Sequence, residues 1–229
     1  MNKIFSGSIE KESGLRKYMI AIFNKMFLAL GLTGIISYLC SSSEQVLAIM
    51  SGGFSIVLML ATFGIVIYLS ARINKIDSEK ANALFWIYSA LLGAFLAPVF
   101  VMYTGESVAN AFFTTAIFFG SLSLYGYTTK RDLTSVGSFM TIGLFAVILT
   151  SFVNIFFLKN SIIQVGLSVL CVVIFCGLTA YDVQKIKNFY NDAHDEEGIK
   201  KIAVIGALNL YLDFINLFLA ILRLFGNRK

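Results

Sequence analysis

The chain has 229 residues, of which 58% are hydrophobic and 14% carry a charged side chain, with a net charge of +5. Soluble domains are nearer one quarter charged, so this composition excludes an ordinary soluble enzyme or binding domain. The basic residues are spread over several polar segments, which favours control of membrane topology over binding to nucleic acid.

Seven apolar segments follow one another along the chain, and each is long enough to cross a bilayer, which takes about 20 apolar residues. A helix satisfies its own backbone hydrogen bonds, so helical spans are the economical interpretation. The predicted spans cover residues 19–40, 46–71, 82–103, 107–126, 137–158, 162–182 and 202–224. The sequence therefore predicts an all-α integral membrane protein with seven transmembrane helices.

The same layout predicts three parts. A polar cytoplasmic tail covers 1–18, a single seven-helix transmembrane domain covers 19–225, and a short basic tail covers 226–229. Thirteen Lys and Arg residues fall in the N-terminal tail and in the connections that follow the second, fourth and sixth predicted spans. Four fall on the opposite side. Cytoplasmic segments carry such an excess, so the N-terminus is predicted to lie in the cytoplasm and the C-terminus outside.

Three of the four basic residues on the predicted outer side are Arg223, Arg228 and Lys229. A basic tail outside is unusual under the rule that places positive charge inside. An even number of spans would move these residues to the cytoplasm, so they are the weakest point of the predicted topology.

Two aspartates stand apart from the other acidic residues. Of thirteen Asp and Glu residues, only Asp182 and Asp213 lie in or against long apolar runs. A carboxylate within hydrocarbon costs about 3 kcal/mol on insertion scales and is a functional-site hypothesis by default. If the polar run at 191–198 is the turn of a helical hairpin, the two aspartates share one half of the membrane. Two carboxyl groups that close resist ionising together, so we expect the pair to hold one proton near neutral pH.

The last predicted span carries a polar stripe around Asp213. Asn209, Asp213 and Asn216 recur with Gly206 and Ala220 at spacings of three and four, which places them on one helix face. Such a face is expected to point into protein or water rather than lipid. It either belongs to an ion pathway or holds helices together through polar contacts.

Asp182 lies near the end of its apolar run, where it is either part of a buried site or an interfacial residue. Val183 and Ile186 indicate that the helix continues beyond it. Tyr181 and Gln184 are either packing and interfacial residues or groups that orient the carboxylate, and their spacing does not separate these interpretations.

The segment Gly177-Leu-Thr-Ala-Tyr-Asp-Val-Gln184 resembles the signature of the BAX inhibitor-1 (transmembrane BAX inhibitor motif) family, and Asn209–Asn216 resembles its last helix. The resemblance implies a bacterial-type member with seven helices, the C-terminal helix central in the bundle, acting as a pH-sensitive calcium leak. In that family two helix-borne aspartates form a hydrogen-bonded pair whose protonation gates the pore. A basic residue at the cytoplasmic end of the second helix pairs with one of them, and the position that fits here is Arg72.

The resemblance thus implies Asp182, Asp213 and Arg72 as the pH sensor and gate. Calcium is expected as the permeant ion, binding Asp182 and Asp213 only transiently, with protons as the second ligand. We expect neither a cofactor nor an enzymatic activity, and no nucleic-acid partner. The expected location is a bacterial inner membrane, with the spans in contact with the lipid bilayer.

Two other functions compete with the leak channel. A regulator without transport of its own would bind another membrane protein, such as a quality-control protease, and nothing in the sequence specifically supports or excludes it. An intramembrane aspartyl protease would also use paired aspartates, and Tyr181-Asp182 resembles the presenilin-type Tyr-Asp motif. The Gly-x-Gly-Asp motif of that family is replaced here by Leu210-Tyr-Leu-Asp213. Its proline-containing third motif is missing as well, since Pro98 is the only proline.

Overall fold

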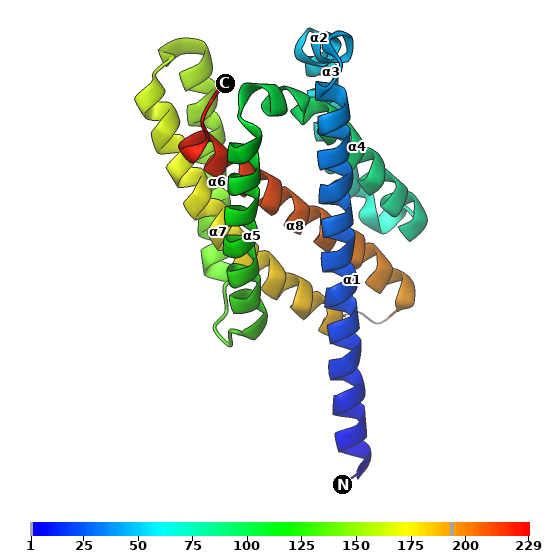
Figure 1. The fold of residues 1–229 in the computed structure, drawn as a ribbon. Coiled ribbons are helices and arrows are strands. Elements are labelled where there is room, and N and C mark those ends of the chain that lie inside the picture. The colour runs from blue at the N-terminus through cyan, green and yellow to red at the C-terminus, as the bar shows by residue number, and fades with distance from the viewer. Residues whose placement is uncertain (1, 193–194) are drawn as a thin grey trace. The chain divides into compact units, whose positions relative to one another are not determined.

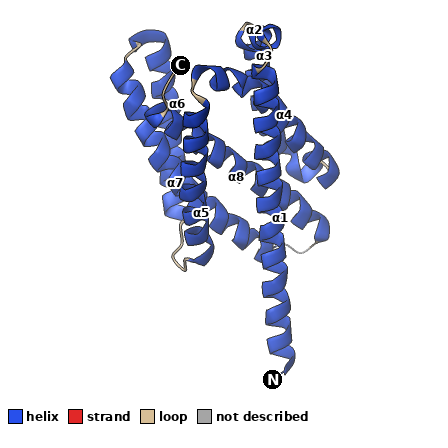
Figure 2. Cartoon of the chain, in the orientation of Figure 1, coloured by secondary structure: helices blue, strands red, loops and turns tan. Residues whose placement is uncertain are grey.

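The computed structural model describes residues 2–192 and 195–229, and nearly all of them are helical (Figures 1 and 2). The described elements are α1 (Asn2–Ser41), α2 (Glu44–Ser51), α3 (Phe54–Arg72), the 3-10 turn η1 (Ile73–Lys75), α4 (Ser78–Met102), α5 (Gly105–Thr128), α6 (Thr134–Val153), the π-helical turn η2 (Asn154–Leu158), α7 (Ser161–Asp192) and α8 (Glu196–Phe225). Of the predicted tail at 1–18, residues 2–18 form the start of α1, and Met1 lies outside the described residues. Residues 193 and 194 of the predicted turn also lie outside them.

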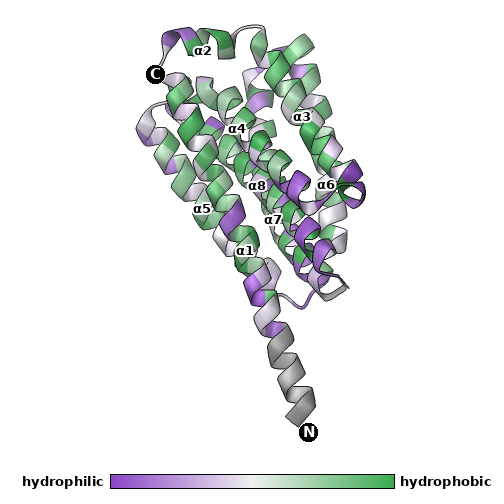
Figure 3. Cartoon of the chain, turned by 90° about the vertical axis from the view of Figure 1, so that its right-hand side faces the viewer, coloured by the Kyte–Doolittle hydropathy of each residue, from purple (hydrophilic) through white to green (hydrophobic). Residues whose placement is uncertain are grey.

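Seven described helices are long and apolar enough to cross a membrane, which confirms the predicted number of spans. Figure 3 shows apolar residues along most of each helix, with hydrophilic residues concentrated toward the helix ends. The spans are Glu12–Ser41, Phe54–Lys75, Ser78–Met102, Gly105–Thr128, Thr134–Leu158, Ser161–Tyr190 and Glu196–Phe225. The chain is therefore a multi-pass integral membrane protein.

The last span is the most enclosed of the seven, as expected for a central helix. In its most apolar stretch 61% of the residues are buried, against 11–33% for the other six spans. A membrane helix at the periphery turns most of its side chains to lipid, so this contrast shows that α8 packs against protein along more of its surface than the other spans do.

The predicted start of the second span, residue 46, is wrong. Residues 44–51 form the separate short helix α2, and the spanning helix α3 begins only at Phe54. Gly52 and Gly53 lie at the break, where Gly52 leaves the helical region with φ −84° and ψ −157°. Glycine costs about 1 kcal/mol relative to alanine inside a helix, so a pair of glycines is a favourable place to end one.

The chain forms two compact units. The first comprises the described residues up to Pro98 together with those of Lys185–Tyr211, and the second comprises Val99–Gln184 and Leu212–Lys229. Helices α4, α7 and α8 each contribute to both units. The predicted single transmembrane domain at 19–225 stays a prediction.

In the first unit, Tyr211 of α8 anchors α1 and α4. Its ring is fully buried against the rings of Phe85 and Tyr88 of α4, with centroids 6.0 and 5.7 Å away. Its hydroxyl is hydrogen-bonded to Thr33 Oγ1 of α1 at 2.6 Å. A side chain at Gly93 of α4 would meet the Thr33 carbonyl oxygen at 2.8 Å, so this glycine lets α1 and α4 pack closely.

In the second unit, the predicted tail at 226–229 folds back on the connection between α4 and α5. Thr104 N donates to Asn227 O at 3.1 Å, and Lys229 N donates to Met102 O at 3.0 Å. The guanidinium group of Arg228 lies 5.9 Å from the ring centre of Tyr103. The tail is therefore attached by a short antiparallel bridge between Tyr103 and Arg228.

Candidate functional site

Asp213 occupies an apolar interior near the middle of α8. Its side chain is 4% exposed, and its Oδ2 atom has no hydrogen-bond partner among the described residues. The adjacent Phe214 packs against the rings of Phe112 and Phe119 of α5, with centroids 5.4 and 5.5 Å away. An acidic oxygen buried in this way is costly unless it is neutralised or protonated, so the position calls for a functional explanation.

Asp182 lies in the same unit, on α7, and is half-buried. Its carboxyl group is close enough to that of Asp213 for the two to interact electrostatically. Helix α7 continues past Asp182 to Asp192, which confirms that this residue is not at a helix end. The structure therefore places both aspartates in the second unit, within range of electrostatic interaction.

Two glycines set the position of the α7 segment that precedes Asp182. A Cβ atom at Gly126 of α5 would overlap the carbonyl oxygen of Ala180, and one at Gly137 of α6 would overlap the ring of Tyr181. Both neighbouring helices therefore approach α7 directly before Asp182. The sequence pattern did not single out these glycines, which are the last residue of the predicted span 107–126 and the first residue of the predicted span 137–158. Small residues in membrane helices often mark such close contacts between helices.

Gln184 fixes the connection between α5 and α6 rather than orienting a carboxylate. Its Oε1 atom accepts a hydrogen bond from Leu133 N at 2.8 Å, and its Nε2 atom donates to Arg131 O at 2.7 Å. In the same connection Asp132 Oδ1 accepts bonds from the hydroxyl and the backbone N–H of Thr134, at 2.6 and 2.9 Å. These bonds lower the pKa of the Asp132 carboxyl group, the hydroxyl bond being the larger cause.

The remaining predicted residues have separate surroundings. Asn216 is half-buried and its Nδ2 atom donates to Leu212 O within α8 at 2.8 Å. Asn209 is half-buried on α8, and Arg72 is exposed as the last residue of α3, both in the first unit. The pairing of Arg72 with Asp182 stays a prediction.

The chemistry available at the paired aspartates is limited to oxygen atoms and protons. In the described part of the chain, no three His, Cys, Asp or Glu side chains gather where they could hold a metal ion. Two carboxyl groups can share a proton, and when ionised they offer oxygen ligands of the kind that hard cations prefer.

Sequence comparisons identify the family. A profile described as "Inhibitor of apoptosis-promoting Bax1" matches residues 15–229. The protein RP147 of Rickettsia prowazekii is 43% identical over 219 residues, covering 95% of this chain and 92% of its own. The inner membrane protein YbhL of Escherichia coli K12 is 41% identical over 225 residues, covering 96% of both chains. The chain therefore belongs to the BAX inhibitor-1 family of membrane proteins.

Proposed function

We propose that this protein is a pH-sensitive cation leak channel, with calcium as the permeant ion and the Asp182–Asp213 pair as its gate. The observation that carries the proposal is the Asp213 carboxyl group, which is buried with one oxygen unpartnered and has a second carboxyl group beside it. A structural role alone gives little reason to keep two acids together inside a membrane, because each lowers the other's tendency to ionise.

In the proposed closed state, Asp182 and Asp213 share one proton and Arg72 pairs with the ionised form of Asp182. Loss of the shared proton adds repulsion between the two carboxylates, which parts α7 from α8. The exposed carboxylate oxygens then suit a hard cation. Two carboxylates bind such an ion only transiently, which conduction requires, since an ion must leave the site as readily as it enters.

We propose a bacterial inner membrane as the location, with the N-terminus in the cytoplasm. The support is the name of the relative YbhL as an inner membrane protein and the excess of basic residues in the predicted cytoplasmic segments. Asp182 and the connection to α8 then lie on the cytoplasmic side, so that the gate responds to cytoplasmic pH.

Calcium flux into liposomes at a series of pH values tests the proposal. Wild-type flux is expected to rise with pH, and Asp182→Asn and Asp213→Asn are each expected to lose this dependence. Asp132→Asn is the matched control, because it removes an exposed carboxylate from the same unit. If both buried-site variants keep the wild-type pH profile, the paired aspartates are not the gate.

Flat flux at every pH, together with a membrane protein that copurifies in stoichiometric amount, would support the regulator instead. We propose that the aspartates catalyse no reaction. Cleavage of a reporter transmembrane helix that requires both Asp182 and Asp213 would contradict this and support an aspartyl protease.

A further inference from the structure

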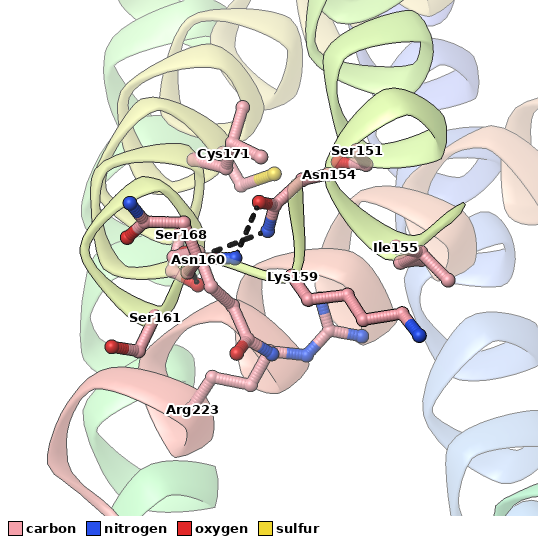
Figure 4. Close-up of a pocket in the computed structure, with 11 residues that line it drawn as sticks. Ser151, Asn154, Ile155, Lys159, Asn160, Ser161, Ser168, Cys171 and Arg223 are labelled. Atoms are coloured by element: carbon pink, nitrogen blue, oxygen red, sulfur yellow. Dashed lines mark hydrogen bonds between the residues drawn. The ribbon is translucent and has the colours of Figure 1, made fainter. Parts of the chain in front are cut away.

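A second polar site lies at the start of α7, whereas Asp182 lies toward its end. A pocket of about 330 Å³ opens between the α6–α7 connection and Arg223 of α8 (Figure 4). Most of its lining side chains are polar, two of them, Lys159 and Arg223, are cationic, and none of the described lining residues is acidic. The site lies wholly within the second unit.

The backbone holds Lys159 at this pocket in an unusual conformation. With φ 49° it is the only residue other than glycine that has a positive φ in the described chain. Such a conformation is unfavourable for lysine and persists where the surrounding structure enforces it. Lys159 N donates to Asn154 O at 2.6 Å, which closes the turn after η2.

Asn154 makes this turn rigid. Its buried side chain accepts a bond from Asn160 N at 3.0 Å and donates to Asn160 O at 3.1 Å, as the dashed lines in Figure 4 show. Asn160 Oδ1 in turn accepts a bond from Ile162 N at 2.8 Å and caps the start of α7. Lys159 thus lies in a turn that is held by hydrogen bonds of the Asn154 and Asn160 side chains.

No described acidic residue neutralises the two cationic groups. Neither Lys159 nor Arg223 forms a salt bridge with a described residue. Uncharged donors complete the lining, among them Ser161 and the amide of Gln164. An ammonium, a guanidinium and neutral donors around one pocket suit a ligand with several anionic oxygens, above all a phosphate group.

The surroundings favour a lipid as the source of that phosphate. The pocket lies near the ends of the spans that finish at Leu158 and Phe225 and near the start of the span that begins at Ser161. The ends of membrane-spanning helices are where lipid headgroups are expected. Beside the pocket, Ile155, Phe157 and Ile162 are 64%, 76% and 80% exposed. Acyl chains can lie on these side chains while the phosphate enters the pocket.

We propose that this pocket binds a phosphate group, with membrane phospholipid as its source. The proposal is independent of the gating function proposed above. It also accounts for basic residues on the predicted outer side. Arg223 would bind the phosphate, while Arg228 lies over the Tyr103 ring and Lys229 Nζ donates to Phe100 O at 3.3 Å. These residues therefore have local partners that do not depend on topology control.

Native mass spectrometry of the purified protein tests the proposal. Phosphatidylglycerol, phosphatidylcholine and diacylglycerol are each titrated against the wild type and the double variant Lys159→Asn/Arg223→Gln. Asparagine tolerates the left-handed backbone at 159, so the turn is kept. The matched control is Arg228→Gln/Lys229→Gln, which removes two positive charges from the same unit but outside the pocket.

Wild type and control are expected to retain both phospholipids but not diacylglycerol, and the double variant to bind them at least about tenfold more weakly. Inorganic phosphate, followed by its effect on thermal unfolding, distinguishes the sources. Displacement of the lipid by phosphate alone would support a soluble ligand for the same site. Equal lipid binding by the double variant and the control would overturn the proposal, as would diacylglycerol binding equal to that of the phospholipids. If the double variant unfolds, Lys159→Arg/Arg223→Lys replaces it, and this charge-preserving pair must bind phospholipid.

Discussion

The second unit carries two polar regions of opposite sign, and they differ in where they lie along the spans. Asp213 is near the middle of α8 and buried among apolar side chains, whereas Arg223 is exposed near the end of the same helix. A charge at the end of a span reaches water or headgroups at little cost. A charge in the middle must be neutralised, protonated or used. The position along α8 thus distinguishes the proposed gate at Asp213 from the proposed binding pocket at Arg223.

The two regions also differ in packing. Around Asp182 the neighbouring helices pack closely, with Gly126 against the backbone of Ala180 and Gly137 against the ring of Tyr181, while the region of Lys159 encloses a pocket of about 330 Å³. Close packing lets a small change in charge act on helix separation, and an open pocket admits a ligand. Substitutions that disturb the close packing around Asp182 are the sharpest way to test this difference in packing.

The largest effect is expected for Gly126→Ala. Its new methyl group would overlap the carbonyl oxygen of Ala180, so α5 must move away from α7. Overpacking of this kind costs about 1–3 kcal/mol. Gly120→Ala in the same helix meets nothing within 4 Å and is expected to leave stability unchanged or slightly higher. Thermal unfolding in detergent compares the two, and equal melting temperatures would refute the close contact.

An effect of similar size is expected for Gln184→Leu. The substitution leaves the buried Leu133 N and the Arg131 carbonyl without their partner, at a cost of about 1–3 kcal/mol. Gln184→Glu keeps the acceptor for Leu133 N and should lose less. Unfolding measurements and proteolysis of the connection at 129–133 check this, with Gln45→Leu on the exposed face of α2 as control. Unchanged proteolysis in Gln184→Leu would show that the amide does not hold the connection.

The smallest effect concerns the exposed carboxylate of Asp132, which accepts two hydrogen bonds from Thr134 at the start of α6. The pKa of Asp132 is lowered in the folded protein by its bonds to Thr134, so its contribution to stability is present above the ordinary carboxyl pKa. That contribution is lost as the pH falls through the lowered value. The melting temperatures of wild type and Asp132→Asn should therefore differ slightly at neutral pH and converge in acid. A difference that grows on acidification would contradict a stabilising role of these bonds.

Hydrophobic pattern predicts most of the fold because a membrane span needs little beyond length and apolarity. The seven spans and the position of Asp182 within a continuing helix follow from that pattern. The break at Gly52 and Gly53 was missed because apolar residues continue on both sides of it. The attachment of the C-terminal tail was missed because backbone bonds between Thr104 and Asn227 leave no trace in side-chain pattern.

The two aspartates of the candidate site could be predicted from the sequence, but the contacts that hold the surrounding segments in place could not. Asp182 and Asp213 stand out because acids are rare in apolar runs. The two hydrogen bonds of the Gln184 side chain go to backbone atoms of residues far away in the sequence, Arg131 and Leu133. The pocket at Lys159 depends on a left-handed turn that lysine does not ordinarily signal.

The sharing of one proton by the two aspartates can be measured directly by infrared spectroscopy of the purified protein at neutral pH. We expect a protonated-carboxyl band in the wild type and in Asp132→Asn. The band should be missing from Asp213→Asn, because the remaining half-buried Asp182 can then ionise without a neighbouring acid. A wild-type protein that shows no protonated carboxyl group at neutral pH would contradict the proposed gate.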